Sequence, residues 1–316
     1  MSFAQHAWYF LPGTVLLAGL LDVTAGDPPN RFHPVAWLGR LIETLAHRQP
    51  KNCPASEFRY GVFVAAATIG LAGAAGFVLD AGFQHLPLWI ALPLGAWALK
   101  SSFSLRGLVE AGKDVESALT SDVLEAQTLL AALVSRPRDL DPPLIVSAAV
   151  ESLAENLTDS VVSPLMYYVL LGLPGALAYR AVNTLDAMLG YRDHREYVGK
   201  TAARIDDVAN YVPTRLTALL IVLAAGLWGR TRAAWRALRT QPQRQYGPNK
   251  TVAIATMAGA LDVQLEKPGA YTLGIGHRQL TPSLIDEATR IVWIVGGAMV
   301  IASAVLTGLL TEAGWR

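Results

Sequence analysis

Two long runs without a charged residue limit what this chain can fold into. Residues 60–79 and 291–310 are each twenty residues long and contain no Asp, Glu, Lys or Arg. A helix of that length is about 30 Å long, which matches the hydrocarbon core of a bilayer. Glycine and alanine crowd the first run at residues 70–76, as is typical where membrane helices pack closely. Both runs are therefore predicted to cross a membrane as helices.

The composition extends this prediction to the whole chain. Of its 316 residues, 52% are apolar and only 16% are charged, against about 25% charged residues in ordinary soluble domains. We therefore expect an all-α fold, a polytopic integral membrane helical bundle that forms a single membrane-embedded domain over residues 1–316. The net charge of +1 does not indicate a polyanionic partner, and the single cysteine excludes an intramolecular disulfide.

Three segments are more polar. Residues 100–142 mix acids and bases, and the apolar spacing at 123–134 is helical, so a soluble helical excursion without a functional site is predicted. Residues 37–46 are amphipathic, and residues 230–250 carry six Lys and Arg and no acid. Both are predicted to be amphipathic interfacial helices, the second resting on anionic lipid at the cytoplasmic face. Nucleic-acid binding is the less favoured interpretation of the second segment.

A Gly- and Pro-containing turn interrupts the apolar run of residues 160–179. The sequence G-L-P-G at 172–175 predicts a re-entrant helical hairpin of two short helices, about 160–171 and 176–190, rather than one straight span. Such a hairpin would return residues 180–192 to the side where 147–159 lies. Irregular backbone at membrane depth is tolerated where protein or a polar cavity surrounds it.

An acidic stripe precedes this hairpin. In V-E-S-L-A-E-N-L-T-D-S, the carboxylates of Glu151, Glu155 and Asp159 stand four residues apart and share one helix face. Like charges at this spacing repel, so beside an apolar run they need a partner, and with Asn156 they could bind a divalent cation or a polar ligand. The alternative is a solvated acidic face at a helix end.

Polar clusters recur downstream, which makes residues 147–215 the predicted active-site core. Asn183 and Asp186 share a helix face, as do Asp206 and Asn210. The arginines of the first cluster could bind phosphate, whereas an N-x-x-D hydrogen-bonded pair beside ordinary cytoplasmic arginines is the alternative. In the second cluster D-D-x-x-N could hold Mg²⁺, but Asp207 could equally pair with Arg204. The two clusters comprise Arg180, Asn183, Asp186 and Arg192, and then Lys200, Arg204, Asp206, Asp207 and Asn210.

Two turns also carry candidate ligand-binding residues. Asp27, Arg31 and His33 lie in a Pro-rich turn, and Asn249 lies in Y-G-P-N-K. A rigid turn explains either segment equally well. Because the chain contains no G-x-x-x-x-G-K-[ST], H-E-x-x-H, C-x-x-C or G-x-S-x-G, the residues alone favour metal-assisted handling of a phosphorylated ligand without a P-loop.

Five collinear motifs together carry a family resemblance. They are G-D-P-P-N-R-F-H-P-V-A-W-L-G (26–39), E-S-L-A-E-N-L-T-D-S-V-V-S-P-L (151–165), Y-R-A-V-N-T-L-D-A-M-L-G-Y-R (179–192), A-R-I-D-D-V-A-N-Y-V-P-T-R-L (203–216) and P-N (248–249). In this order they closely resemble the adenosylcobinamide-phosphate synthase family of cobalamin biosynthesis, called CbiB or CobD. One departure is K-T-V-A-I-A after Asn249, where the family usually has small residues and Gly-Trp.

The resemblance implies a multi-pass enzyme of the bacterial inner membrane with its active site facing the cytoplasm. Such an enzyme joins adenosylcobyric acid, a corrinoid, to (R)-1-amino-2-propanol O-phosphate through an amide, using ATP and Mg²⁺. The resemblance is also compatible with a homo-oligomer or with association with other cobalamin-assembly enzymes. A membrane prenyltransferase-like enzyme that uses Mg-diphosphate, and a transporter or sensor relative without enzymatic activity, remain alternatives.

The same resemblance assigns roles to the clusters. Glu155 and Asp206 are expected to be catalytic, and the phosphates are expected on the cations of residues 180–204. Other substrate contacts are expected from Asp27, Arg31, His33, Asn156, Asn183, Asp186, Asn210 and Asn249. Magnesium-bound ATP is expected on Glu151, Glu155, Asp159, Asp206 and Asp207, which would share one cavity.

Overall fold

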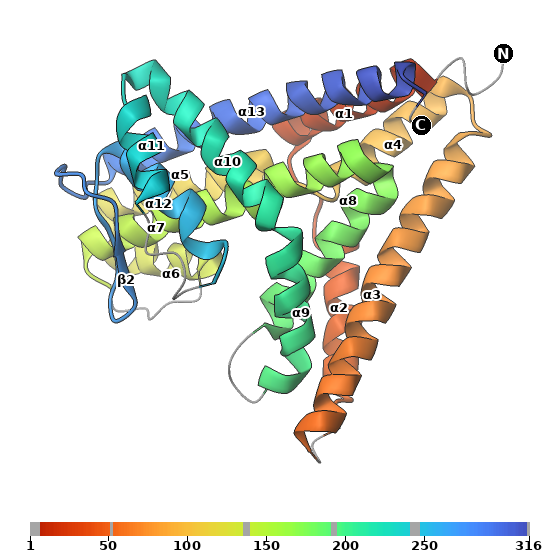
Figure 1. Cartoon of the computed structure of the whole chain (residues 1–316), viewed down its shortest axis with the longest axis horizontal. Helices are drawn as coiled ribbons and strands as arrows, with labels where there is room; N and C mark the ends of the chain where they lie inside the picture. Colours follow the sequence, from red (N-terminus) through yellow and green to blue (C-terminus); the bar gives the residue numbers. More distant parts are fainter. Residues whose placement is uncertain (1–6, 51–52, 135–139, 191–194, 241–246, 315–316) are drawn as a thin grey trace. The chain divides into compact units, whose positions relative to one another are not determined.

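The computed structural model describes residues 7–50, 53–134, 140–190, 195–240 and 247–314, and these are helical almost throughout (Figure 1). The only strands in the described residues are β1 (Leu265–Lys267) and β2 (Tyr271–Leu273), which pair antiparallel. The predicted all-α class is confirmed.

Several helices are long and apolar enough to cross a membrane. They include α3 (Pro54–Phe83) and α13 (Ser283–Glu312), which contain the two uncharged runs. The stretches Pro142–Leu189 and Tyr211–Trp228 also qualify by length and composition. Leu71, Phe77 and Val78 of α3 are more than half exposed, as expected of side chains that face lipid rather than water. The chain is a multi-pass membrane protein.

The chain forms two compact units. Unit 1 comprises Met1–Ser104, Ser163–Asn210 and Met299–Arg316, and unit 2 comprises Leu105–Val162 and Tyr211–Ala298. Helix α13 therefore contributes to both. Its C-terminal part packs on α1 (Ala7–Ala25) in unit 1, where a Cβ at Gly19 would meet Val300 Cγ1 at 2.8 Å.

In unit 1, helix α3 lies alongside α2 (Pro34–Ala46), α8 (Ser163–Leu189) and α9 (Glu196–Ala209) (Figure 1). Their apolar faces bury a common core that includes Ile42, Val64, Leu185 and Val198. Helix α2 begins with Pro34, at a position where the backbone N–H has no partner within the helix, so the missing N–H of proline does no harm. In the same unit, α1 packs on α4 (Leu88–Lys100).

Helix α8 folds back on itself, which confirms the predicted hairpin. Its backbone leaves the helical conformation at Gly172, with φ 70° and ψ −157°. The rings of Tyr167 and Tyr179 stack with centroids 5.1 Å apart, although twelve residues of straight helix would separate them by about 18 Å. The hydroxyls of Ser163 and Tyr179 also reach the same side chain, that of Asn210.

The tip of this hairpin packs on a glycine of α3. A Cβ at Gly76 would lie 2.6 Å from Pro174 Cα and 2.9 Å from the Leu173 carbonyl carbon, and both are backbone atoms that cannot rotate away. A Cβ at Gly70, on the same helix, would meet no atom within 4 Å. The glycine-rich run therefore lets the hairpin approach α3 closely.

Gly76→Ala should destabilise the protein by about 1–3 kcal/mol, because overpacking against backbone forces one element to move. Gly70→Ala is the matched control and should be neutral or slightly stabilising, because alanine favours helix and the site is open. Denaturant unfolding of the purified protein in detergent measures both. Equal stabilities for the two variants would contradict this packing.

Unit 2 is built around α7 (Pro142–Leu157), which continues into the π-helical turn η2 (Thr158–Val162). Nearly all of α7 is buried, with α5 (Leu105–Ser121), α6 (Val123–Leu133) and α12 (Lys250–Leu261) against it. The remaining elements are α10 (Tyr211–Ala224), the 3₁₀ turn η3 (Ala225–Trp228), α11 (Thr231–Arg239), β1 and β2.

Helix α12 was not expected from the sequence, which presents residues 251–281 as Gly-rich and mixed. Every residue from Thr251 to Leu261 is buried. A helix that is buried on all sides has no amphipathic stripe, so hydrophobic periodicity does not reveal it.

Candidate functional site

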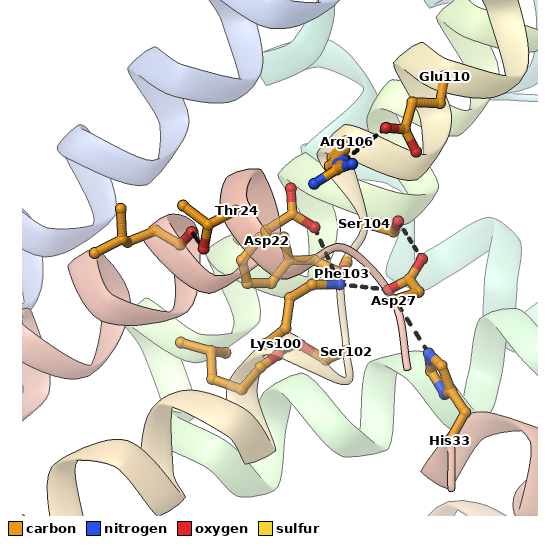
Figure 2. Close-up of polar contacts among 12 residues, drawn as sticks. Asp22, Thr24, Asp27, His33, Lys100, Ser102, Phe103, Ser104, Arg106 and Glu110 are labelled. Carbon is orange, nitrogen blue, oxygen red and sulfur yellow. Dashed lines mark hydrogen bonds and ion pairs between the residues drawn. The ribbon is translucent and has the colours of Figure 1, made fainter. Parts of the chain in front are cut away.

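A buried lysine organises the polar centre of unit 1. The Nζ atom of Lys100 lies 3.0 Å from Asp22 Oδ1, is paired with Asp27 Oδ1, and donates to the Phe103 carbonyl at 3.1 Å. The side chains of Lys100 and Asp22 are 4% and 1% exposed. Figure 2 shows the ammonium between the two carboxylates. A lysine so far from water is stable only because these oxygens satisfy its charge.

Asp27 fixes the turn that joins α1 to α2. Its Oδ2 accepts a hydrogen bond from Ser104 Oγ at 2.6 Å, and His33 Nε2 lies 3.8 Å from Oδ1 (Figure 2). His33 Nδ1 accepts from the Val35 backbone N–H at 3.2 Å, as the N-cap of α2. With Nδ1 occupied as an acceptor, neutral His33 carries its proton on Nε2, facing Asp27.

These contacts keep the Asp27 carboxyl ionised. Burial by itself raises its pKa, but the nearby His33 imidazole, hydrogen bonds from Lys100 and Ser104, and the charge of Lys100 outweigh burial and hold the pKa well below the ordinary aspartate range. A group whose pKa is lowered by folding stabilises the fold above its unfolded pKa, and that stability is lost as the pH falls toward the folded pKa.

We therefore expect acidification below about pH 4, the ordinary aspartate pKa, to destabilise the protein partly through Asp27. Melting temperatures from pH 6 to pH 3 should fall more steeply for the native protein than for Asp27→Asn, which has no proton to gain. Parallel curves for the two proteins would contradict this contribution.

The sequence predicted only part of this cluster. Asp27 and His33 were candidates, whereas Asp22 and Lys100 were not, and residues 100–142 were assigned no site. The sequence did contain a signal for both residues. Asp22 directly follows the apolar segment 7–21, and Lys100 directly follows the apolar segment 86–99, and a lone charge at such a position needs a buried partner. Arg31, also a candidate, stacks over the Phe32 ring at 4.6 Å, and its carbonyl accepts from the indole of Trp37.

A second polar group in unit 1 centres on Asn210, which is 3% exposed. Its Oδ1 accepts from Ser163 Oγ and Tyr179 Oη, both at 2.8 Å, and so joins the two arms of the hairpin. Its Nδ2 lies 3.0 and 3.1 Å from the two carboxylate oxygens of Asp206, as the predicted four-residue spacing requires. Asn210 thus orients Asp206 while it holds the hairpin closed.

Asn210→Ala should destabilise the protein by about 1–3 kcal/mol for each buried polar group left without a partner. Val208→Ala on the same helix, where Val208 is 78% exposed, is the control and should change little. Denaturant unfolding in detergent compares the two. A loss no larger than that of the control would show that Asn210 does not hold the hairpin.

The remaining candidates of unit 1 lie on α8 and α9. Arg180 Nη1 donates to Asn183 Oδ1 at 3.2 Å, a pairing that was not predicted from the sequence. Asp186 is half-buried one turn further along, whereas Lys200, Arg204 and Asp207 are exposed. Arg192 lies outside the described residues.

Arg180 also lines a pocket of about 280 Å³ between α2, α3 and α8. The pocket is mostly apolar, with Trp37, Leu71 and Leu177 among its walls, and Ser101 also lines it. Pro34 and Val35, which directly follow His33, close one side. The pocket is therefore lined by Arg180 and by residues that directly follow His33 and Lys100 in the chain.

In unit 2, Glu151 is bound on both carboxylate oxygens. Ser147 Oγ lies 3.0 Å from Oε1, and Tyr271 Oη donates to Oε2 at 2.7 Å. Ser147 also accepts from the backbone N–H of Glu266 at 2.7 Å. These bonds attach the β1–β2 hairpin to α7, a structural role that helical spacing does not predict.

The other unit 2 candidates are more open. Glu155 and Asp159 are half-buried, and Asn156 donates to the Ser152 carbonyl within its helix. Asn249 Oδ1 accepts from Arg215 Nη1 at 3.2 Å, and the Arg215 guanidinium lies 3.5 Å from the Tyr211 ring centroid. Arg215 therefore holds the Pro248–Asn249 motif and is a further residue that sequence reasoning did not select.

The candidate residues thus fall into groups within each unit. Among the described residues, no three or more His, Cys, Asp or Glu side chains form a group able to hold a metal ion by themselves. Mg²⁺ commonly uses one or two carboxylates together with substrate phosphates rather than an all-protein cage. The magnesium role of each carboxylate, and their meeting in one cavity, stay predictions.

Comparison with known proteins gives a consistent result. The family described as "CobD/Cbib protein" matches residues 15–292. The "Probable cobalamin biosynthesis protein CobD" of Pyrococcus furiosus is 40% identical over 288 residues, covering 89% of this chain and 94% of that protein. The "Cobalamin biosynthesis protein CbiB" of Salmonella typhimurium is 37% identical over 299 residues, covering 88% and 92%. No solved structure is a significant match.

Proposed function

Because the chain belongs to the CobD/CbiB family of cobalamin biosynthesis proteins, we propose that it is the enzyme that joins adenosylcobyric acid to (R)-1-amino-2-propanol O-phosphate. The product is adenosylcobinamide phosphate. The observation that carries this proposal is the extent of the family match, because residues 15–292 contain every candidate site residue from Asp27 to Asn249.

The reaction requires activation of an unreactive carboxylate. In the proposed course, a carboxylate oxygen of the corrinoid attacks the γ-phosphorus of ATP, which gives an acyl phosphate and releases ADP. The amine nitrogen then attacks the acyl carbon, phosphate leaves with the bridging oxygen, and the nitrogen loses a proton. Such a reaction depends mainly on positioning and on neutralising phosphate charge.

Among the proposed catalytic residues, Asp206 has the carboxylate that the surrounding side chains orient best. Its carboxylate is oriented by buried Asn210, which is itself held by Ser163 and Tyr179, so Asp206 is preorganised by side chains of both hairpin arms. Asp206 and the adjacent Asp207 would hold magnesium, which neutralises and orients the phosphates of bound ATP. Glu155 is proposed as the second catalytic carboxylate, with Glu151 and Asp159 as further magnesium ligands.

Cationic and polar side chains would hold the phosphorylated substrates. Arg180, Arg192, Lys200 and Arg204 supply the charge, and guanidinium groups match phosphate geometry well. Arg180 also borders the apolar pocket, which suits the aliphatic part of a substrate. The turn of Asp27, Arg31 and His33 and the side chains of Asn156, Asn183, Asp186 and Asn249 would complete the contacts.

The proposed reaction also suggests where in the cell the protein acts. The enzyme would lie in the bacterial inner membrane with its active site facing the cytoplasm, where ATP is present. Association with other cobalamin-assembly enzymes, or of several copies of the chain, would bring sequential corrinoid steps together.

The test is turnover by the purified chain in lipid nanodiscs. Adenosylcobyric acid, the amino alcohol phosphate and Mg-ATP together should give a corrinoid whose mass equals that of both substrates less one water, and omission of any one component should abolish it. Ethanolamine phosphate in place of the aminopropanol ester measures amine selectivity. Product without ATP, or turnover of a prenyl diphosphate instead, would overturn the proposal.

A further inference from the structure

Helix α11 in unit 2 has two sharply different faces. Ala234 and Ala237 are buried against α12, where a Cβ at Gly259 would lie 2.6 Å from Ala237 Cβ. The side chains on the other face are exposed, and Trp235 has 45% of its surface accessible. This exposed face consists of Arg232, Trp235, Arg236 and Arg239, at the spacing of one helical stripe.

The position of α11 along the chain places this face close to a membrane surface. The candidate span Tyr211–Trp228 ends only two residues before α11 begins, and Gly229, with φ 69°, makes the turn between them. Two residues reach at most about 7 Å. Leu223 and Leu227, near the end of the span, are 63% and 71% exposed, so the apolar surface continues almost to the turn.

The three arginines are not used within the described protein. Arg230, just before the helix, is paired with Glu287, whereas no side-chain hydrogen bond or ion pair holds Arg232, Arg236 or Arg239 among the described residues. Arg236 and Arg239 complement the negative end of the helix dipole, but Arg232 lies in the first turn, where a positive charge is disfavoured. The dipole therefore does not account for the whole stripe.

We propose that this face of α11 binds the headgroups of anionic phospholipid in the leaflet where the span Tyr211–Trp228 ends. The arginines supply charge complementary to lipid phosphates, and an exposed tryptophan beside them suits the interface between headgroups and acyl chains. The face would anchor unit 2 to the membrane surface. This inference does not depend on the proposed reaction, because it uses no residue assigned to the site.

The experiment compares three forms of the full chain in detergent: the native protein, the variant R232Q/R236Q/R239Q, and the charge-retaining variant R232K/R236K/R239K. Each is titrated with phosphatidylglycerol and, separately, with phosphatidylcholine, and bound lipids are counted by native mass spectrometry. Equal melting temperatures establish that all three are folded. Duplex DNA is titrated as the competing polyanion.

The native protein should prefer phosphatidylglycerol, and the glutamine variant should lose affinity for it by about fivefold per arginine removed, while the lysine variant retains most of it. In nanodiscs of brominated phosphatidylglycerol, W235F should show less fluorescence quenching than the native protein. Unchanged phosphatidylglycerol binding by the glutamine variant would overturn the proposal. So would tight DNA binding that depends on the three arginines while lipid binding does not.

Discussion

Replacing Asp206 with asparagine should lower the rate of corrinoid amidation by about 10²–10³-fold, the usual effect of removing one preorganised charged group from the reacting centre. Asparagine is nearly isosteric with aspartate, and its side-chain oxygen can still accept from Asn210 Nδ2. The fold and the hairpin should therefore survive. If Asp206 holds magnesium, the variant should also need a higher concentration of Mg-ATP for half-maximal rate.

The matched control is Glu196→Gln, which removes one exposed carboxylate from the start of the same helix. Its rate should stay within about twofold of the native enzyme, because the change costs only a few tenths of a kcal/mol of helix-dipole energy. Rates are measured on purified proteins of equal melting temperature. An Asp206→Asn enzyme with native activity would remove Asp206 from the catalytic role.

Replacing Lys100 with methionine should destabilise the protein by about 3–5 kcal/mol, the cost of leaving a buried charge without its partner. Asp22, with a 1% exposed side chain, would be left without the ammonium that now lies 3.0 Å away. Methionine is close to lysine in length and shape, so lost packing contributes little. Denaturant unfolding in detergent measures the loss, and Lys113→Met, an exposed lysine on α5, is the control.

A second variant separates charge from packing. In Asp22→Asn/Lys100→Met the unpaired buried carboxylate is gone, and the remaining partner, Asp27, is 36% exposed and can be hydrated. The double variant should therefore recover most of the stability that the single variant loses. A double variant no more stable than Lys100→Met would mean that the effect comes from packing rather than from charge.

The sequence predicted most where local patterns are sufficient. Uncharged runs identify α3 and α13 because their lipid-facing residues leave no room for charge, and Gly172 with Pro174 identifies the hairpin because only a turn suits them. The pairing of Asp206 with Asn210 follows from helical spacing alone.

Local sequence patterns could not predict the contacts between segments that lie far apart in the chain. Lys100 meets Asp22 and Asp27, and Glu151 meets Tyr271, across long stretches of sequence, so neither pairing has a periodic signal. The clamp on Asn210 from both hairpin arms likewise exists only after the chain has folded back at Gly172. Through these contacts Asp27, Glu151 and Asn210, which the sequence predicts as ligand-binding residues, also stabilise the fold.

Activation of the corrinoid through an acyl phosphate is tested by following the oxygen of its carboxylate. The purified enzyme would be given adenosylcobyric acid labelled with ¹⁸O in the reacting carboxylate, together with the amino alcohol phosphate and Mg-ATP, and the released phosphate would be analysed by mass spectrometry. Activation through an acyl phosphate should place one ¹⁸O atom in the inorganic phosphate for each amide formed. Amide formation with unlabelled phosphate would contradict it.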